Sequence, residues 1–413
     1  MLFLYQVILT IIILISPAII VYRILKDKEH RSRYKEKFGF YSKRRINGKL
    51  IWFHGASVGE ILSIVPLVKN YEKDQSINQI LITSNTLSSS KIIKKFKFKK
   101  TIHQFYPIDH NFITQKFLKY WKPDLAIYIE SEVWPSMFYE LDRKKIPLIL
   151  LNTRITKVSF NRWQIFPNFA KHVFGKISLA LPQNLETFRY LKLLKVKKIK
   201  IAGNLKYYGQ KNNQDRMNKL LKNKFSDFKV WCAASTHNEE EILIGKLHKR
   251  LKKREKKLIT IIIPRHINRT NKIISDLNNM DLNCITHSSK QKIQKKTDIY
   301  LVDSYGETSK FYNLTNVSFV GGSLIKHGGQ NPLEPARLGN HIINGPNVKN
   351  FKEIYAFLNK LKMSSSTSNI STMENIIFKK LKTKTHNKNI KKITQIGNNI
   401  LKKNLFYLNK YLI

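Results

Sequence analysis

A carboxylate at the opening of a helix is the first feature of this sequence that could do chemistry. The run 50–53 predicts a short buried strand, and Gly55 and Gly59 bracket small residues after it. From Glu60 onward the apolar spacing becomes helical. A strand, a glycine-rich turn and a helix form the crevice of an open α/β sheet, where ligands lie beyond the strand's carboxyl end. Glu60 is therefore either a partner of the helix dipole or a general base in a ligand-binding cleft.

Polar residues follow two further apolar runs in this half of the chain. The run 125–129 ends in Glu130-Ser-Glu132, and the run 147–151 ends shortly before Arg154. Two carboxylates this close could form an acid/base pair. Alternate residues of an extended segment point to opposite faces, so we expect at most one of them to face the cleft. The alternative is that one caps the following turn while the other hydrogen-bonds backbone.

The second half of the chain repeats this arrangement of strands and polar loops. The run 230–234 leads into Ser235, and the run 258–263 leads into Pro264, Arg265 and His266. Polar residues just after parallel strands are where a site belongs in a doubly wound sheet.

Two glycine pairs follow the strand expected at 317–320. Gly321 and Gly322 come first, and Gly328 and Gly329 precede a helix that ends near Gly339. A glycine turn that opens a helix offers backbone N–H groups to a phosphate. The sequence contains neither the dinucleotide-binding fingerprint nor a Walker A motif, so this pattern predicts an anion site of another kind.

The alternation of strands and helices predicts the fold class, which is α/β with parallel doubly wound sheets. A length of 413 residues suits two such domains. We expect a membrane anchor at 1–25, an N-terminal domain at 34–205 and a C-terminal domain at 229–390. The polar segment 206–228 reads as a linker between the domains, and 391–413 as a basic helical tail.

The N-terminal run 2–22 contains no charged residue and predicts a transmembrane helix. At 1.5 Å per residue it is about 30 Å long, which is enough to cross a bilayer. A signal peptide would have basic residues before the run, whereas here they follow it, between Arg23 and Lys37. Positive flanks stay in the cytoplasm, so we expect the remaining chain there. The alternative is a buried core helix.

The composition is strongly basic, with 75 Lys and Arg against 27 Asp and Glu and a net charge of +48. This balance suits nucleic acid, an anionic membrane surface or phosphorylated substrates. The lysines are spread over every segment, and no basic stretch interleaved with aromatic residues forms a recognisable nucleic-acid module, so we expect no nucleic-acid partner. Cys232 and Cys284 have no metal-ligand spacing, which favours a reduced protein without disulfides.

Four blocks together resemble the signatures of the 3-deoxy-D-manno-octulosonic acid (Kdo) transferases of lipopolysaccharide synthesis. The blocks are His54-Gly-Ala-Ser-Val-Gly-Glu60, Glu130-Ser-Glu-Val-Trp-Pro135, Pro264-Arg-His266 and the glycine-rich segment 321–335. They occur in the family's order, and the resemblance extends over residues 1–360.

The resemblance implies a GT-B fold, in which two Rossmann-like doubly wound domains face a central cleft behind an N-terminal transmembrane helix. It implies transfer of Kdo from CMP-Kdo to a lipid A precursor with inversion at the anomeric carbon. CMP-Kdo is a co-substrate, and the resemblance implies no cofactor and no metal. The expected location is the inner membrane, with anionic lipids as partners and both domains on the cytoplasmic side.

The resemblance also assigns roles residue by residue. Glu60 matches the family's general base, which takes the proton from the acceptor's hydroxyl group. The residues matched to the donor side are Pro264, Arg265, His266, Gly322, Ser323, Asn331, Glu334, Lys206 and Ser235. Those expected to support the acceptor side are Ser57, Gly59, Glu130, Glu132 and Arg154.

Two positions depart from the family pattern. Tyr208 stands where the family usually has Asp, and Asn268 stands where Glu is common, which puts contacts near the hinge in doubt. His266 could instead pack in its loop, and Glu334 could face solvent. A catalytically inactive membrane scaffold is a further alternative, against which the intact Glu60 and nucleotide blocks argue.

Overall fold

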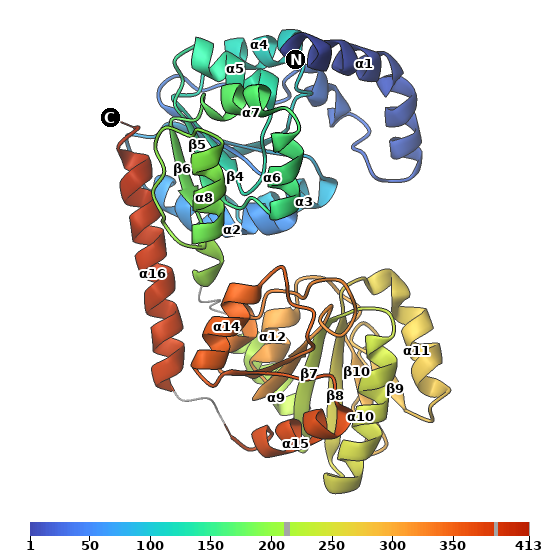
Figure 1. The fold of residues 1–413 in the computed structure, drawn as a ribbon. Coiled ribbons are helices and arrows are strands. Elements are labelled where there is room, and N and C mark those ends of the chain that lie inside the picture. The colour runs from blue at the N-terminus through green and yellow to red at the C-terminus, as the bar shows by residue number, and fades with distance from the viewer. Residues whose placement is uncertain (210–214, 384–386, 413) are drawn as a thin grey trace. The chain divides into compact units, whose positions relative to one another are not determined.

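The computed structural model describes residues 1–209, 215–383 and 387–412. Figure 1 shows the path of the chain, which forms two compact units. Unit 1 comprises Met1–Tyr208 and Gly397–Ile413, and unit 2 comprises Gly209–Ile396.

Unit 1 is built on a six-stranded parallel sheet with the order β3-β2-β1-β4-β5-β6. This order reverses between β1 and β4, which makes that point the crevice in which a doubly wound sheet binds ligands. The strands are β1 (Leu50–His54), β2 (Gln79–Ser84), β3 (Thr101–Phe105), β4 (Leu125–Ile129), β5 (Leu148–Thr153) and β6 (Leu179–Pro182).

Helices flank the sheet of unit 1 and bury both of its faces. Trp52 and Tyr128 belong to one apolar cluster and Ile51 and Ile127 to another, as expected for strands covered on two sides. The helical segments are α2 (Val58–Tyr71), α3 (Leu87–Lys95), α4 (Asn111–Trp121), α5 (Pro135–Arg143), α6 (Lys157–Gln164), α7 (Pro167–Phe174), α8 (Leu185–Leu193) and the 3₁₀ helix η2 (Leu205–Tyr207).

Unit 2 has a seven-stranded parallel sheet with the order β13-β12-β11-β7-β8-β10-β9. Its order reverses beside β7, where β11 lies on one side and β8 on the other. The strands are β7 (Lys229–Thr236), β8 (Leu258–Pro264), β9 (Cys284–Thr286), β10 (Ile299–Leu301), β11 (Val317–Val320), β12 (His341–Asn344) and β13 (Ser364–Ser366).

Most helices of unit 2 lie between its strands along the chain, as the alternating sequence pattern predicts, while α9 precedes β7 and α15 follows β13. Both cysteines are free thiols. The helical segments are α9 (Asp215–Lys224), α10 (Glu240–Arg254), η3 (Ile267–Arg269), α11 (Thr270–Asn278), α12 (Thr308–Tyr312), α13 (Leu333–Arg337), α14 (Lys352–Lys360) and α15 (Ile370–Lys380).

Two segments divide differently from the boundaries expected from sequence. Within the expected linker 206–228, residues 206–208 belong to unit 1 and α9 belongs to unit 2, where Leu221 and Phe225 pack on its core; residues 210–214 lie outside the described residues. The expected tail is part of α16 (Asn387–Asn409). From Gly397 onward it belongs to unit 1, where Leu401 and Leu408 join the apolar core.

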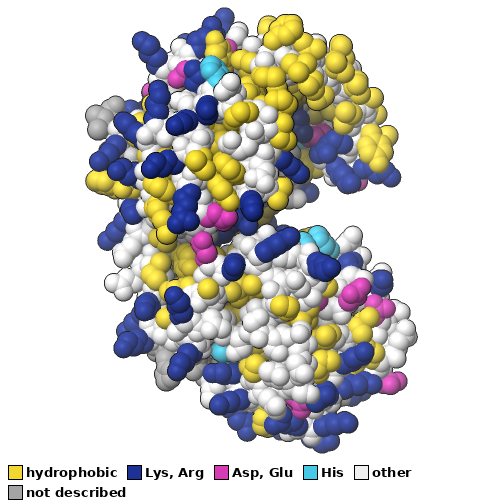
Figure 2. All heavy atoms as spheres, viewed as in Figure 1, with side chains coloured by type: hydrophobic (Ala, Val, Ile, Leu, Met, Phe, Trp, Pro, Cys, Tyr) yellow, Lys and Arg dark blue, Asp and Glu magenta, His cyan; other side chains and the backbone are white. Residues whose placement is uncertain are grey.

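The N-terminal segment of unit 1 consists of α1 (Leu2–Leu25) and the 3₁₀ helix η1 (Arg33–Phe38). With a mean hydropathy of 2.5 and 24 residues, α1 is long and apolar enough to cross a membrane. Figure 2 shows hydrophobic side chains gathered over α1, with Lys and Arg side chains where the helix ends.

Candidate active site

Glu60 lies in the first turn of α2, directly behind the carboxyl end of β1. Ser57 is the N-cap residue, and its hydroxyl accepts a hydrogen bond from the Glu60 backbone N–H. The carboxylate accepts two bonds in return, from the Ser57 hydroxyl at 2.8 Å and from the Ala56 N–H at 2.8 Å. This reciprocal arrangement is a form of capping box, so Glu60 does stabilise the helix start.

The environment of Glu60 also raises the pKa of its carboxyl group. Burial raises its pKa to about 7, the Ser57 hydrogen bond opposes the shift, and the charges of Glu132 and Glu130 add to it. A carboxylate with a pKa near the working pH is suited to general base catalysis. Capping and catalysis are therefore compatible roles for this side chain.

Glu130 and Glu132 follow β4, next to β1 in the sheet. Glu130 has a left-handed backbone with a φ of 57°, which breaks the regular alternation of an extended segment. Both carboxylates lie close enough to raise the pKa of Glu60. Alternation does not continue through Glu130, so it gives no geometric basis for expecting at most one carboxylate to face the crevice.

Each of these carboxylates has a defined partner. Glu130 Oε1 lies 2.6 Å from Lys206 Nζ. Glu132 Oε2 lies 3.2 Å from His54 Nε2 and accepts a hydrogen bond from the Trp134 indole at 3.0 Å. Because the His54 side chain is fully buried, its pKa is lowered, although Glu132 opposes the shift. A neutral His54 can thus hold Glu132 by donating a hydrogen bond.

The remaining acceptor-side residues lie around these carboxylates. The Arg154 N–H donates to the Glu130 carbonyl at 3.3 Å. Gly59 has room for a side chain, whereas a Cβ on Gly55 would lie 3.0 Å from Ile129 and 3.2 Å from the Glu60 Cβ. Gly55 is therefore the glycine that the close approach of the turn requires. Sequence reasoning singled out Gly59 and assigned no role to His54.

In unit 2, the loops after β7, β8 and β11 meet at one edge of the sheet. Pro264 is buried at the end of β8, and Arg265 and His266 are exposed just beyond it. The Arg265 N–H donates to the Thr236 carbonyl at the end of β7, at 3.0 Å. Ser235 is half-buried with a φ of 56°.

The glycine turn after β11 is bound to a carboxylate of the protein itself. Buried Glu240 accepts hydrogen bonds from the N–H groups of His237 (2.9 Å), Gly322 (2.8 Å), Ser323 (3.1 Å) and Leu324 (3.1 Å). The backbone N–H groups of Gly322 and Ser323, two residues matched to the donor side, are thus already occupied. Sequence reasoning missed Glu240, although it lies in the first turn of α10.

Ser323 also differs from the expectation of a donor contact. Its side chain is fully buried, and its hydroxyl donates to the Val320 carbonyl and accepts from the Gly345 N–H at 2.9 Å. It therefore holds the loop in place.

Histidines surround the same loops. The His237 ring lies 4.3 Å from the His327 ring and 5.9 Å from the His266 ring. Burial and, to a smaller extent, the neighbouring His327, His266, Arg265 and Arg269 lower the pKa of His237 to about 4. His237 is therefore a neutral donor or acceptor, and sequence reasoning gave it no role.

The last predicted donor residues lie where the glycine segment enters α13. Asn331 Oδ1 accepts the Leu333 N–H at 3.1 Å, and half-buried Glu334 accepts a hydrogen bond from the Ser309 hydroxyl. Lys206, also assigned to the donor, lies in unit 1 beside Glu130. Within the described residues, no group of three or more His, Cys, Asp and Glu side chains could hold a metal ion.

Comparison with known proteins decides the family. The sequence model of 3-deoxy-D-manno-octulosonic-acid transferase (kdotransferase) matches residues 32–208. The 3-deoxy-D-manno-octulosonic acid transferase of Haemophilus influenzae is 33% identical over 342 residues, covering 81% of this chain and 79% of that protein. The chain belongs to the Kdo transferase family. The Rickettsia bellii member is 37% identical over 341 residues, covering 81% of this chain and 80% of its own.

Family membership makes the chain a glycosyltransferase that transfers Kdo in lipopolysaccharide biosynthesis. Its fold is similar to that of the UDP-GlcNAc 2-epimerase of Neisseria meningitidis bound to UDP-GlcNAc. The two have a TM-score of 0.57 and 14% identity over 88% of this chain and all of that one. The predicted family, enzyme class and GT-B fold are confirmed.

Proposed function

We propose that the enzyme transfers Kdo from CMP-Kdo to a lipid A precursor, with inversion at the anomeric carbon and Glu60 as general base. The observation that carries the proposal is a carboxyl group with a pKa of about 7 at the point where the strand order of unit 1 reverses. A group of this acidity is about half ionised near neutral pH, so it can both accept a proton and release it again.

In the proposed step, Glu60 takes the proton of a sugar hydroxyl of the acceptor. The hydroxyl oxygen forms the new bond to the anomeric carbon of Kdo from the face opposite CMP. The bond between that carbon and the CMP phosphate oxygen breaks, and CMP leaves with the electron pair. Both carboxylate oxygens of Glu60 already accept one hydrogen bond. Each has a second lone pair available for the proton.

Other residues position the reacting groups. His54 and Lys206 hold the Glu132 and Glu130 carboxylates close to Glu60, and the negative charges of these two carboxylates raise the pKa of Glu60. In unit 2, Arg265 is the group we assign to the CMP phosphate, because it is exposed directly after β8 and a guanidinium binds phosphate oxygens in pairs. Pro264, Ser235, Gly322 and Ser323 would shape the donor loops. We assign His266, Asn331 and Glu334 to donor contacts.

The proposal includes no cofactor and no metal, since CMP-Kdo has a single phosphate and a cationic side chain can balance it. The enzyme would act at the cytoplasmic face of the inner membrane, where α1 and the basic residues after it meet anionic lipids. Nucleic acid is not a proposed partner.

The test combines purified enzyme, CMP-Kdo and a tetra-acylated lipid A precursor, with the products resolved by mass and the anomeric configuration determined by NMR. We expect a product heavier by one or more Kdo residues with an inverted linkage, in the presence or absence of EDTA. Release of CMP without a glycolipid product would overturn the acceptor assignment. Transfer that stops on EDTA treatment of a reaction supplied with ready-made CMP-Kdo would overturn metal independence.

A further inference from the structure

The two ends of the segment 5–37, which contains α1 and most of η1, contact two adjacent residues of unit 1, Asp109 and Ile108. At the start of α1, the Tyr5 hydroxyl donates to Asp109 Oδ2 at 2.8 Å. Near the end of η1, the Ile108 N–H donates to the Lys37 carbonyl at 2.8 Å. Within unit 1, the segment 5–37 therefore begins and ends at the same place, the loop between β3 and α4.

The attachment at the start of α1 is made by the helix's few polar residues. The Gln6 side chain accepts the Asn111 N–H at 3.0 Å and donates to the Ser136 hydroxyl. Thr10 Oγ1 lies 3.3 Å from His110 Nε2. These partners are the first residues of α4 and α5 or lie next to them.

Asp109 links the start of α1 to the start of α5. Its buried carboxylate accepts the Ser136 and Met137 N–H groups at 2.9 and 2.8 Å, which caps α5, and it receives Tyr5 as well. The polar residues Tyr5 and Gln6 of α1 thus bind other residues of unit 1.

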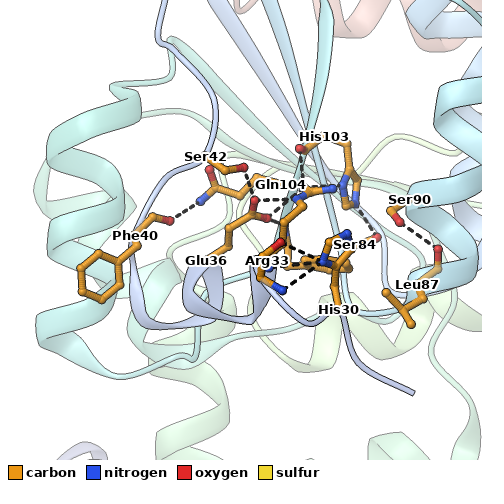
Figure 3. A network of polar contacts seen from close by, with 12 residues as sticks. His30, Arg33, Glu36, Phe40, Ser42, Ser84, Leu87, Ser90, His103 and Gln104 are labelled. Carbon is orange, nitrogen blue, oxygen red and sulfur yellow. Dashed lines mark hydrogen bonds and ion pairs between the residues drawn. The ribbon is translucent and has the colours of Figure 1, made fainter. Parts of the chain in front are cut away.

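The attachment after α1 is ionic and also buried. Glu36 is bound by Arg33 at 2.7 Å, by the Phe105 N–H at 2.7 Å and by the Ser42 hydroxyl. Arg33 also donates to the His103 carbonyl at 2.8 Å. Figure 3 shows this network of η1 with β3 and the loop after η1.

A helix that crosses a bilayer cannot keep both attachments. Twenty-four residues of α-helix extend about 36 Å, so the ends of a spanning α1 would lie on opposite sides of the hydrocarbon core. To keep both attachments, the charged segment after α1 would then have to return through lipid, where Lys, Arg and Asp side chains are strongly unfavourable. Its charged residues are Lys26, Asp27, Lys28, Glu29, Arg31, Arg33, Lys35, Glu36 and Lys37.

We propose that α1 is a monotopic anchor, inserted in a single leaflet with both of its ends on the side of the catalytic units. The inference deepens the proposed membrane-bound function and rests on it. The sequence predicted a helix that spans the bilayer. Insertion in one leaflet instead keeps the contacts of Tyr5 and Lys37.

One face of α1 consists of exposed apolar side chains that can insert among the acyl chains of such a leaflet. Phe3 is 81% exposed and Leu14 is 75% exposed, whereas Ser16 and Ile20 are buried. Phe112, one residue after the partner of Gln6, is 70% exposed and extends the apolar surface to α4. Exposed large apolar side chains along α1 are Phe3, Leu4, Val7, Ile8, Ile11, Ile12, Leu14, Ile15, Ile19, Val21, Tyr22 and Leu25.

Cross-linking in membranes tests the attachment directly. Thr10→Cys and His110→Cys, in a Cys284→Ser background, place two accessible thiols where the native side chains are 3.3 Å apart. We expect a short bismaleimide to join them efficiently in inner-membrane vesicles. In a spanning helix, position 10 would lie about 20 Å or more from the cytoplasmic end. The matched control pairs Leu14→Cys with His110→Cys and should cross-link poorly.

Protease accessibility tests the same point without changing α1. An epitope tag fused ahead of Met1 should be digested in inside-out vesicles, together with the catalytic units, and protected in spheroplasts. Digestion of the tag only in spheroplasts would overturn the proposal, as would absence of the Thr10–His110 cross-link in protein that still binds CMP-Kdo. Failure of Kdo transfer in protein that cross-links as expected would instead count against the proposed function and leave the monotopic insertion standing.

Discussion

Lys206 Nζ lies 2.6 Å from Glu130 Oε1, and this pair sits beside the carboxyl group that we assign as the general base. Glu130 and Glu132 both favour a protonated Glu60 through their negative charge. Lys206 offsets part of that charge. The acidity of Glu60 therefore depends on a residue that sequence resemblance places on the donor side.

Lys206→Met should move the acid limb of the pH–rate profile to higher pH. Glu60 must be ionised to act as a base, so kcat/KM should fall as pH drops below about 7. Removing Lys206 leaves Glu130 uncompensated and raises the pKa of Glu60 further. The profile of kcat/KM against pH measures the shift, and the exposed Lys198→Met is the control. An acid limb that stays in place or moves to lower pH would contradict this coupling.

Glu60→Gln should retain CMP-Kdo binding and lose transfer by roughly 10²–10⁴-fold, the usual contribution of a positioned base. The amide cannot accept the proton, and its single oxygen can replace only one of the two carboxylate oxygens that accept from Ser57 and Ala56. Single-turnover transfer and calorimetric titration with CMP-Kdo separate the two effects. Glu186→Gln, an exposed carboxylate in the first turn of α8, is the matched control. Near-normal turnover of the Glu60 variant would remove this residue from the mechanism.

The same Glu60→Gln substitution should stabilise the fold at pH 8 more than at pH 4. The folded pKa of about 7 exceeds the usual 4.5, so the folded state binds the proton more tightly and stability falls as pH rises between these values. At about 1.4 kcal/mol per pKa unit, the removed penalty is at most about 3.5 kcal/mol. Thermal unfolding at both pH values measures it. Equal effects at pH 4 and pH 8 would mean that Glu60 has an ordinary acidity.

Sequence patterns predicted the two α/β units and the strands that the polar loops follow, and the four sequence blocks predicted the family. Those inferences succeed because strand periodicity and the position of a polar residue after a strand are local properties. His54, Pro264 and Arg265 all occur at or just after the strand ends where the patterns placed them. The family blocks then assigned Glu60 its proposed role, which spacing alone left open between a cap and a base.

The unpredicted features depend on contacts between distant residues or on backbone geometry. Glu240 binds the turn at Gly322–Leu324, more than 80 residues away, and no local pattern encodes that pairing. The left-handed backbone of Glu130 cannot be read from an extended strand. The apolar run of α1 predicted a membrane helix, but the partners of Tyr5 and Gln6 become visible only when α4 and α5 are in place.

Glu240→Gln should loosen the donor loop and weaken CMP-Kdo binding. Its two carboxylate oxygens accept four backbone N–H groups, and an amide nitrogen cannot accept any of them. A buried N–H left without a partner costs about 1–3 kcal/mol, so we expect a lower melting temperature and a raised Kd. Exposed Glu239→Gln is the adjacent control. Unchanged CMP-Kdo affinity in the Glu240 variant would show that this turn does not support the donor.

Deleting residues 1–22 should change membrane binding from salt-resistant to salt-sensitive. The truncated chain loses the apolar face of α1 but keeps the basic residues from Arg23 to Lys37, each attracted to an anionic surface by about 1 kcal/mol. Salt screens that attraction, whereas it leaves apolar burial in place.

Asp109 still accepts the Ser136 and Met137 N–H groups, so unit 1 should remain folded and CMP-Kdo binding should be normal. Co-sedimentation with anionic vesicles at low and high salt measures the difference, and transfer to vesicle-bound acceptor should fall with it. If the truncated protein sediments with vesicles as fully as the intact protein in high salt, α1 is not the main anchor.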